Sequence, residues 1–199
     1  MDELHYKRFY AVGDCYRFLF DAMRSIPDLK RARKKSLLPD DFMERIMLAV
    51  TEVNGCEICS YFHTGEALKK GVSPGEIKRL LAGDLEDAKE EEATALFFSQ
   101  HYAEQHGRPD KEAWDRMISV YGEKTAYGIL AAIRMIYMGN AYGIAAGAFL
   151  RRLKGNAVRK SSLGYELSVL LSFVFCLPVL VIHLVVASLF SQSKLSFSK

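Results

Sequence analysis

The C-terminal part of the chain contains a long run without charged residues. No Asp, Glu, Lys or Arg occurs from Leu167 to Ser193, and residues 167–190 are almost wholly apolar. As a single helix, residues 167–190 would be about 36 Å long, enough to cross a hydrocarbon layer of about 30 Å. Because such side chains must be covered by lipid or by protein, this run limits the folds open to the chain. We predict a membrane helix over 167–190.

The charges on the two sides of this run predict its orientation. The downstream side carries Lys194 and Lys199, whereas the upstream side carries five basic residues: Arg151, Arg152, Lys154, Arg159 and Lys160. By the positive-inside rule, the N-terminal domain would then be cytoplasmic, anchored to the cell membrane, with the tail 191–199 across it. A membrane helix tolerates Pro178, and His183 has a modest cost. Two alternatives stay open, a helix buried in an oligomer core and an interfacial segment.

The composition of the chain excludes several classes of protein. With 199 residues, 50% hydrophobic and 26% charged, the chain has enough apolar material for one ordinary domain plus an additional segment, and it is not intrinsically disordered. The net charge of +3 gives no case for nucleic-acid binding. The first residues, 1–7, contain early acids and no apolar stretch, so we expect no secretory signal peptide.

Residues 1–155 are predicted to form an all-α domain, followed by a basic and polar linker over 156–166. Apolar side chains recur at helical spacing, and no stretch alternates as a strand would. One helix is expected over 86–106, and a long one over 123–153 is rich in small residues. Small residues suit close contact between helices, including helices of different subunits. Glycines that follow the apolar patterns predict where helices end: Gly55, Gly71, Gly83, Gly107 and Gly122.

Three reactive side chains share one face of the helix expected after Gly55. Cys56, Cys59 and His63 are spaced i, i+3 and i+7. Cys56 falls in the first turn, where unpaired backbone N–H groups and the helix dipole lower the pKa of a thiol from its usual value near 8.5. His63 lies one turn beyond Cys59, a separation at which an imidazole can accept a thiol proton.

An acidic residue on the preceding helix completes this group. Glu44 lies twelve positions before Cys56. If the two helices pack antiparallel, its carboxylate reaches His63 and orients the ring. The two thiols can then close a disulfide after one of them has captured oxygen from an oxidant. The residues alone leave open which cysteine attacks, since the helix start favours Cys56 and the spacing to His63 favours Cys59.

The string Glu44-x11-Cys56-x2-Cys59-x3-His63 resembles the active-site motif of the alkylhydroperoxidase AhpD-like branch of the carboxymuconolactone decarboxylase family. The resemblance covers about residues 10–155, including the helix of Asn140. It implies an AhpD-like helical bundle that forms homo-oligomers, with peroxiredoxin-type reduction of hydroperoxides and an unidentified dithiol as reductant. It further implies that Cys59 attacks, Cys56 resolves, His63 acts as base and Glu44 tunes the relay. No cofactor and no metal is expected.

Two features depart from the pattern of that family, and three other functions compete with the peroxidase interpretation. Ile58 stands where AhpD proteins often have a histidine, and the family core lacks a segment like 167–190. A zinc site formed by Cys56, Cys59, His63 and Glu44 is disfavoured, because no second C-x-x-C or H-x-x-H pair supports it. A non-catalytic, membrane-associated thiol redox sensor is the main alternative. A decarboxylase is less favoured, because that branch does not depend on a C-x-x-C pair.

Overall fold

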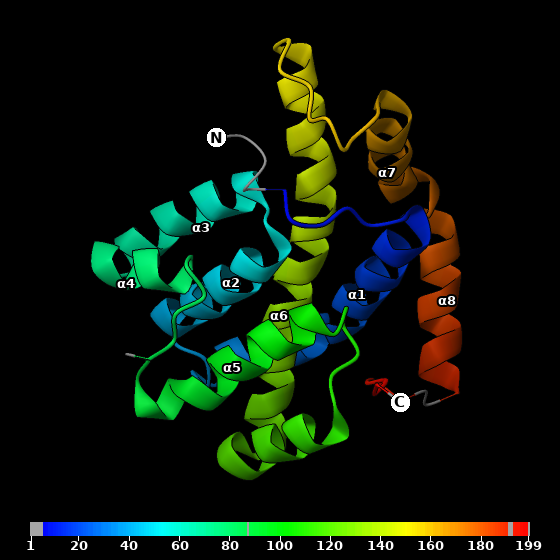
Figure 1. Cartoon of the computed structure of the whole chain (residues 1–199). Coiled ribbons are helices and arrows are strands. Elements are labelled where there is room, and N and C mark those ends of the chain that lie inside the picture. The colour runs from blue at the N-terminus through cyan, green and yellow to red at the C-terminus, as the bar shows by residue number, and fades with distance from the viewer. Residues whose placement is uncertain (1–5, 87, 191–192, 199) are drawn as a thin grey trace.

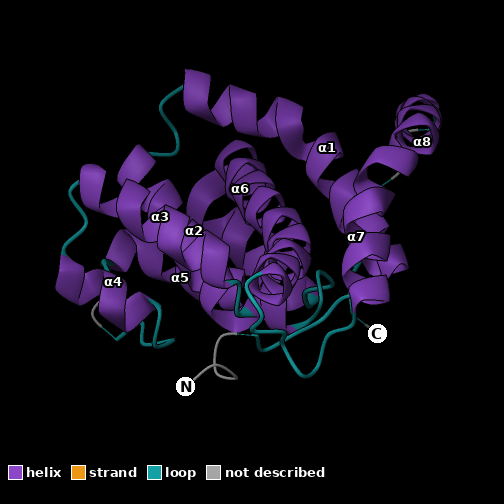
Figure 2. Ribbon diagram, turned by 90° about the horizontal axis from the view of Figure 1, so that it is seen from above, coloured by secondary structure: helices purple, strands orange, loops and turns teal. Residues whose placement is uncertain are grey.

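The computed structural model describes residues 6–86, 88–190 and 193–198, and within them it contains helices and no strand (Figures 1 and 2). The all-α fold expected from the sequence is confirmed. The helices are α1 (Val12–Lys34), α2 (Asp40–Asn54), α3 (Glu57–Lys69), α4 (Pro74–Leu80), α5 (Glu90–Glu104), α6 (Lys111–Leu153), α7 (Leu163–Phe175) and α8 (Leu177–Leu189).

Helix α6 forms the centre of the bundle. It runs the length of the molecule, and α1, α2 and α5 pack around it (Figures 1 and 2). By length and hydropathy α6 could cross a membrane, but 67% of its apolar stretch is buried inside the protein. Ile129, Ile133 and Ile144 on this helix are fully buried. Its composition therefore reflects its place in the core.

Most helix ends lie where the sequence predicted them. Gly55 ends α2 in the left-handed conformation, and the Ser73 side chain accepts a hydrogen bond from the Glu76 backbone N–H at the start of α4. Gly122 (φ 71°, ψ 156°) interrupts the helical backbone within α6, at the predicted break. Helix α5 is shorter than the expected 86–106. The Glu86 N–H donates to the Asp84 side chain in a turn, so the helix begins only after it.

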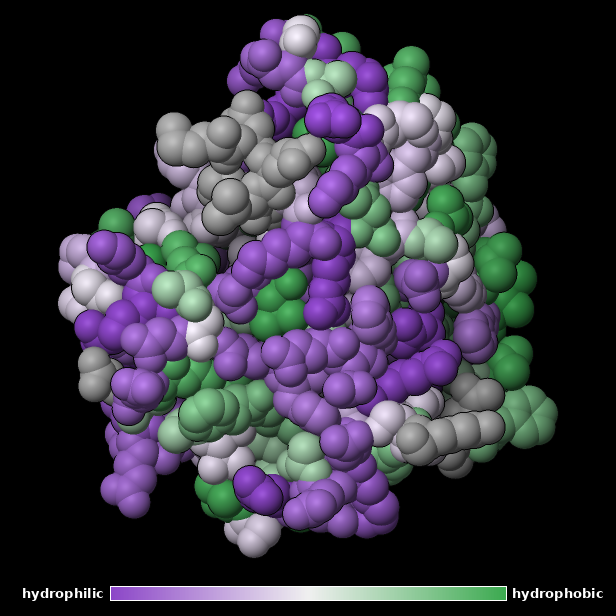
Figure 3. Space-filling view, in the orientation of Figure 1, coloured by the Kyte–Doolittle hydropathy of each residue, from purple (hydrophilic) through white to green (hydrophobic). Residues whose placement is uncertain are grey.

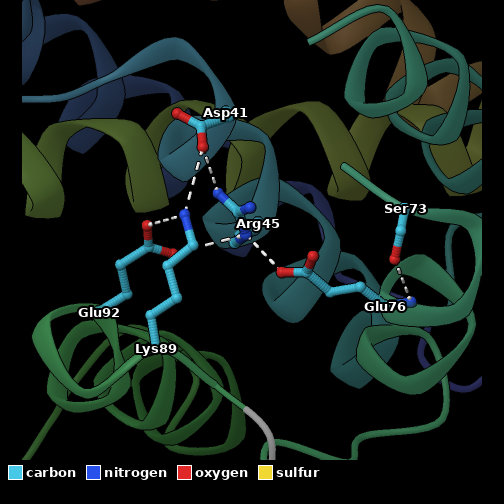
Figure 4. A network of polar contacts seen from close by, with 6 residues as sticks. All are labelled: Asp41, Arg45, Ser73, Glu76, Lys89 and Glu92. Carbon is cyan, nitrogen blue, oxygen red and sulfur yellow. Dashed lines mark hydrogen bonds and ion pairs between the residues drawn. The ribbon is translucent and has the colours of Figure 1, made fainter. Parts of the chain in front are cut away.

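A buried arginine joins α2 to α4 and α5 (Figure 4). Arg45 Nε donates to Glu76 at 2.5 Å, and Nη1 donates to Asp41 at 2.7 Å. Glu92 and Lys89 of the α5 region complete the network, with 3.3 Å between them. The hydrogen bond from Arg45 lowers the pKa of Asp41, whereas burial raises the pKa of Glu92. This network fixes α2 immediately beside Glu44.

The apolar C-terminal run differs from the single helix expected over 167–190. It forms α7 and α8, which are bent by 54° at Cys176. Pro178 has no N–H to continue the hydrogen bonds of α7 and lies in the first turn of α8. Helix α7 already begins at Leu163, within the predicted linker 156–166. Taken together, the bent pair is long and apolar enough to cross a membrane, but each helix alone spans only about 20 Å.

Candidate active site

The two cysteines lie at the junction of α2 and α3. Gly55 adopts φ 72° and ψ 49°, and its N–H bonds to the Thr51 carbonyl, which reverses the chain after α2. Cys56 is then the N-cap of α3, and its sulfur accepts the backbone N–H of Cys59 at 3.3 Å. The two sulfurs are joined in a disulfide, with 5.3 Å between the Cα atoms. The start of α3 thus holds the Cys56 sulfur near unpaired backbone donors, as the sequence predicted.

The surroundings of the two sulfurs differ. Cys56 is 1% exposed, whereas Cys59 is partly exposed and its sulfur lies 3.7 Å from the Gly139 carbonyl oxygen of α6. Cys59 also lines a pocket of about 300 Å³, which Cys56 does not line. A molecule that enters this pocket therefore reaches Cys59 first.

His63 lies on the same side as Cys59 and is held by the preceding helix. Its Nδ1 is 2.8 Å from Glu44 Oε2, the contact predicted from the antiparallel packing of α2 on α3. An ionised carboxylate only accepts hydrogen bonds, so with Glu44 ionised Nδ1 carries the proton. In the neutral ring this leaves Nε2 as the nitrogen that can accept a proton. Both side chains are largely buried, at 16% exposure for His63 and 9% for Glu44.

The pocket beside Cys59 is apolar. Apart from Cys59 and His63, its lining consists of Met47, Ile58, Phe62, Met135, Ile136 and Gly139. None of these residues carries a charge. The pocket is therefore shaped for a molecule with a hydrocarbon part, and it places that molecule next to a sulfur and an imidazole.

The other side of the disulfide is polar. A second pocket of about 350 Å³ is lined by Cys56 together with the ion pair Lys7–Glu52. Nearby, Tyr6 Oη donates to the carboxylate of Glu57, the first residue of α3, at 3.1 Å. Burial, followed by the charge of Glu57, raises the pKa of Tyr6 to about 12. The segment before α1 thus covers the Cys56 side of the site.

A glycine of α6 makes room for the disulfide. A Cβ atom at Gly143 would lie 2.7 Å from Cys56 Sγ and 2.8 Å from Cys59 Sγ, closer than side chains approach one another. By sequence, Gly139 and Gly143 are two of the small residues in the long helix expected over 123–153, which suit close contact between helices. Their spacing of four residues, one helical turn, on the helix that the resemblance also includes is the signal that could have placed them at the cysteines.

Asn140 lies on the same helix but is inside the core. It is 0% exposed, and its Oδ1 accepts from the Thr51 hydroxyl at 3.2 Å. Cys15 is free and buried, and Cys176 lies between α7 and α8. Among the residues that the structure describes, no group of three or more His, Cys, Asp or Glu side chains is arranged to hold a metal ion.

Comparison with known proteins finds one family model and one relative that are similar to the chain. Residues 21–98 match the model of the carboxymuconolactone decarboxylase family. The chain is also similar to a protein described as uncharacterized protein YdfG of Bacillus subtilis (strain 168), with 28% identity over 135 residues, which are 66% of this chain and 91% of the relative. No solved structure gives a significant match. The matched segment, 21–98, contains Glu44, both cysteines and His63, so the candidate site lies within the part of the chain that is similar to the carboxymuconolactone decarboxylase family.

Proposed function

We propose that this protein is a cysteine-based peroxidase that reduces organic hydroperoxides through a Cys56–Cys59 dithiol and disulfide cycle. One observation carries the proposal. Cys59 and His63 line the same apolar pocket, while Cys56 is bonded to Cys59 from the buried side. A peroxidatic thiol must meet its substrate, and a resolving thiol must meet only the first sulfur. The two positions fit these two requirements.

In the oxidative half-reaction the thiolate of Cys59 attacks the terminal peroxide oxygen. The O–O bond breaks, an alcohol leaves with a proton, and Cys59 becomes a sulfenic acid. The Cys56 thiol then attacks the Cys59 sulfur, the S–O bond breaks, and water leaves as the disulfide forms. Two electrons pass from the two thiols to the peroxide.

The reductive half-reaction needs a dithiol donor. One donor thiolate attacks Cys59, the sulfur that is reached from the pocket, and Cys56 leaves as a thiolate. The start of α3 stabilises this leaving group, because the Cys56 sulfur already accepts the Cys59 N–H. The second donor thiol then closes the donor's own disulfide and releases reduced Cys59.

His63 and Glu44 supply the proton transfers in this scheme. With Nδ1–H held by Glu44, Nε2 can take the Cys59 thiol proton and return it to the leaving alkoxide. Glu44 touches neither sulfur nor substrate in this arrangement, so we assign it a positioning role. Ile58, where a histidine often stands in AhpD proteins, lines the pocket and adds apolar surface instead.

The pocket lining favours an organic hydroperoxide over hydrogen peroxide. Five of its side chains are hydrocarbon, aromatic or thioether groups, and they give an alkyl chain a place to bind: Met47, Ile58, Phe62, Met135 and Ile136. A decarboxylase of the kind that gives the family its name would have to hold a carboxylate. Apart from His63, the described lining offers no basic side chain for that task.

We also propose that the protein acts as a homo-oligomer through the solvent-exposed side of α3. Tyr61 is 86% exposed, Phe62 is 58% exposed and Leu68 is 47% exposed, which is unusual for apolar side chains on neighbouring turns of one helix. Light scattering on the full chain and on Leu68→Ser, which lies outside the pocket lining, tests this contact. A monomeric wild-type protein would refute it.

A turnover assay tests the proposed reaction. Full-length protein in mild detergent is mixed with cumene hydroperoxide and dithiothreitol, and peroxide loss is followed by stopped flow. Catalysis predicts the loss of many equivalents of peroxide per protein. A thiol redox sensor would consume about one equivalent and stop. Cys15→Ser is the matched control, because Cys15 is a buried free cysteine away from the site, and it should leave the rate unchanged.

A further inference from the structure

The outer sides of α7 and α8 form a continuous apolar surface on one flank of the molecule. Green, hydrophobic atoms follow this flank along the right edge of Figure 3. Phe175 is 73% exposed and Ile182 is 65% exposed. We call this surface the outer face, and it consists of the exposed residues Leu163, Leu167, Leu171, Phe173, Val174, Phe175, Leu177, Val179, Val181, Ile182, Val185, Val186, Leu189 and Phe190.

Both ends of the helix pair are fixed to the bundle by polar contacts. At the start, Glu166 is 0% exposed and accepts two hydrogen bonds from Arg152, at 2.7 and 2.8 Å. After α8, Lys194 Nζ donates to Asp28 of α1 at 2.6 Å, and the Ser198 N–H bonds to the Pro109 carbonyl. The segments before and after the apolar pair therefore lie on the same body. A span would place them on opposite sides of a bilayer.

The inner side of α8 is also fixed to α1. His183 accepts or donates a hydrogen bond with the Tyr16 hydroxyl at 3.0 Å, and its ring stacks on Phe20 at 3.8 Å between centroids. Leu180 and Ala187 are buried against the same helix. The one polar ring within the apolar run thus faces protein. The surface left to the surroundings is mostly apolar, and the hydroxyls of the exposed Ser168 and Ser188 donate to carbonyls of their own helices.

An arginine-lined cavity lies directly beside α8. It has a volume of about 900 Å³, and four arginines line it, with Asp21 as the only acidic residue of the described lining. His183 of α8 and Phe20 of α1 also line it, so the cavity adjoins the helix pair. The four arginines are Arg17, Arg24, Arg108 and Arg134.

One of these arginines is deeply buried. Arg134 is 3% exposed, and its guanidinium donates to the hydroxyls of Tyr102 and Ser25 and to the Lys194 carbonyl. These acceptors carry no negative charge. Asp21 in the lining and Asp14, which lies 3.6 Å from Arg17, offset two of the four arginines, so the cavity keeps an excess of positive charge. A cavity of this kind is suited to a phosphate group.

We infer that the outer face lies within one leaflet of an anionic bilayer, without crossing it, and that the arginine-lined cavity binds the phosphate of a lipid headgroup. In a bilayer the headgroup phosphates lie next to the hydrocarbon, as the cavity lies next to the outer face. The inference is independent of the redox chemistry. It replaces the spanning helix expected from the sequence with attachment from one side.

Charge favours lipid over a second copy of the chain as the partner of this surface. A symmetric dimer through the outer face would use the same patch of both copies and bring two positively charged cavities towards each other. An anionic leaflet instead supplies the opposite charge. Three exposed basic residues that precede α7 (Lys154, Arg159 and Lys160) add to this attraction at the other end of the pair, whereas Arg151 and Arg152 are paired with Glu57 and Glu166.

Vesicle binding tests the two parts of the surface separately. Full-length protein is floated with vesicles of phosphatidylcholine alone or with 30% phosphatidylglycerol. We expect Arg24→Gln combined with Arg108→Gln to weaken binding to the anionic vesicles by about 25-fold, from about fivefold for each charge. Arg116→Gln combined with Lys124→Gln removes the same charge elsewhere, on the first half of α6, and should have little effect.

The apolar part is tested by a charge on the outer face. Ile182→Asp should abolish binding to both vesicle types, whereas Val120→Asp, at an apolar position that is 54% exposed on α6, should not. If the wild-type protein binds no vesicles and Ile182→Asp instead dissociates a dimer, the occupant is a second copy. If inorganic phosphate binds in the cavity but the protein does not bind vesicles, the proposal is also overturned.

Labelling from outside the vesicle distinguishes one-sided attachment from a span. In a Cys176→Ala background, Ser196→Cys in the exposed part of the tail is treated with a membrane-impermeant maleimide. Glu112→Cys on the bundle is the reference for full access. One-sided attachment predicts labelling of both sites in intact vesicles, more slowly at residue 196, because Ser196 lines the arginine-lined cavity. Labelling at residue 196 that requires detergent would show a spanning helix and overturn the inference.

Discussion

The two sulfurs of the disulfide are three residues apart, yet their surroundings have little in common. Cys59 faces an apolar pocket with His63, whereas Cys56 is buried at the start of α3 beside a polar pocket and the Lys7–Glu52 ion pair. The helix start favours a thiolate at Cys56, but access favours attack at Cys59. The more acidic position and the more accessible position are therefore different sulfurs. The first suits Cys56 as a leaving group, and the second suits Cys59 as a nucleophile.

The largest expected effect removes the accessible sulfur. Cys59→Ser should lower peroxide turnover by at least about 10³-fold, because a hydroxyl at this position is far less nucleophilic than a thiolate. Cys56→Ser should also stop turnover but allow one equivalent of peroxide to react, leaving a sulfenic acid on Cys59 that a dimedone probe labels. If Cys56→Ser instead blocks the first reaction with peroxide, the two roles are reversed.

A methyl group between α6 and the sulfurs should disturb both cysteines. Gly143→Ala places a Cβ 2.7 Å from Cys56 and 2.8 Å from Cys59, so the sulfurs must shift. We expect turnover to fall by about 10²-fold, as for other small displacements of reacting groups. Mass spectrometry after peroxide treatment should find less Cys56–Cys59 disulfide.

Gly65→Ala is the matched control for this change. Gly65 is in the middle of α3, and a Cβ there would meet no atom within 4 Å. Both substitutions replace glycine within a helix, and alanine favours a helix by about 1 kcal/mol. Equal losses of turnover in the two variants would contradict the proposed role of Gly143.

Glu44 contacts His63, which lines the pocket on the Cys59 side of the disulfide. Glu44→Gln should lower turnover tenfold to a hundredfold, the range for partners that orient a functional histidine. An amide at this position can donate to Nδ1 as well as accept from it, so the Nε2 base is no longer assured. The measurement is the pH profile of turnover, whose acidic limb should change, because a general base loses its function where it becomes protonated. Glu44→Asp should restore part of the rate, whereas a loss from unfolding would leave the profile of the remaining activity unchanged.

The apolar pocket predicts selectivity between substrates. Phe62→Ser removes an aromatic ring from the pocket lining. We expect the ratio of kcat/KM for cumene hydroperoxide to that for hydrogen peroxide to fall about tenfold, because only the organic substrate uses that surface. An equal loss for both peroxides would place the ring's effect on the cysteine and not on the substrate.

The smallest expected effect concerns the segment before α1, which covers the Cys56 side of the site. Tyr6→Phe removes the hydrogen bond to Glu57 and should cost about 1 kcal/mol in the free energy of unfolding. The pKa of Tyr6 is raised from 10 to about 12, so its contribution is complete below pH 10 and is lost as the pH rises to 12. Denaturant unfolding at several pH values should therefore show the difference between the two proteins shrinking over this window. Tyr61→Phe, at an exposed ring, is the control for loss of a hydroxyl.

Much of the fold and of the redox site follows from local sequence. Glycine at Gly55 and Gly122 ends or interrupts helices because of backbone conformations that it alone adopts easily. Helical spacing places Cys56, Cys59 and His63 near one another, and a tight turn between antiparallel helices brings Glu44 to the ring. These are short-range consequences of helix geometry, so they could be predicted without the structure.

Other features depend on contacts between distant parts of the chain. Whether Cys56 or Cys59 faces the apolar pocket depends on where α6 passes, and the space that Gly143 leaves for both sulfurs is a property of that packing. The sequence determined that residues 167–190 are apolar and must be covered. Only the tertiary structure decided that they bend at Cys176 and return Lys194 to Asp28, because hydropathy measures the need for cover and packing determines which side each end occupies.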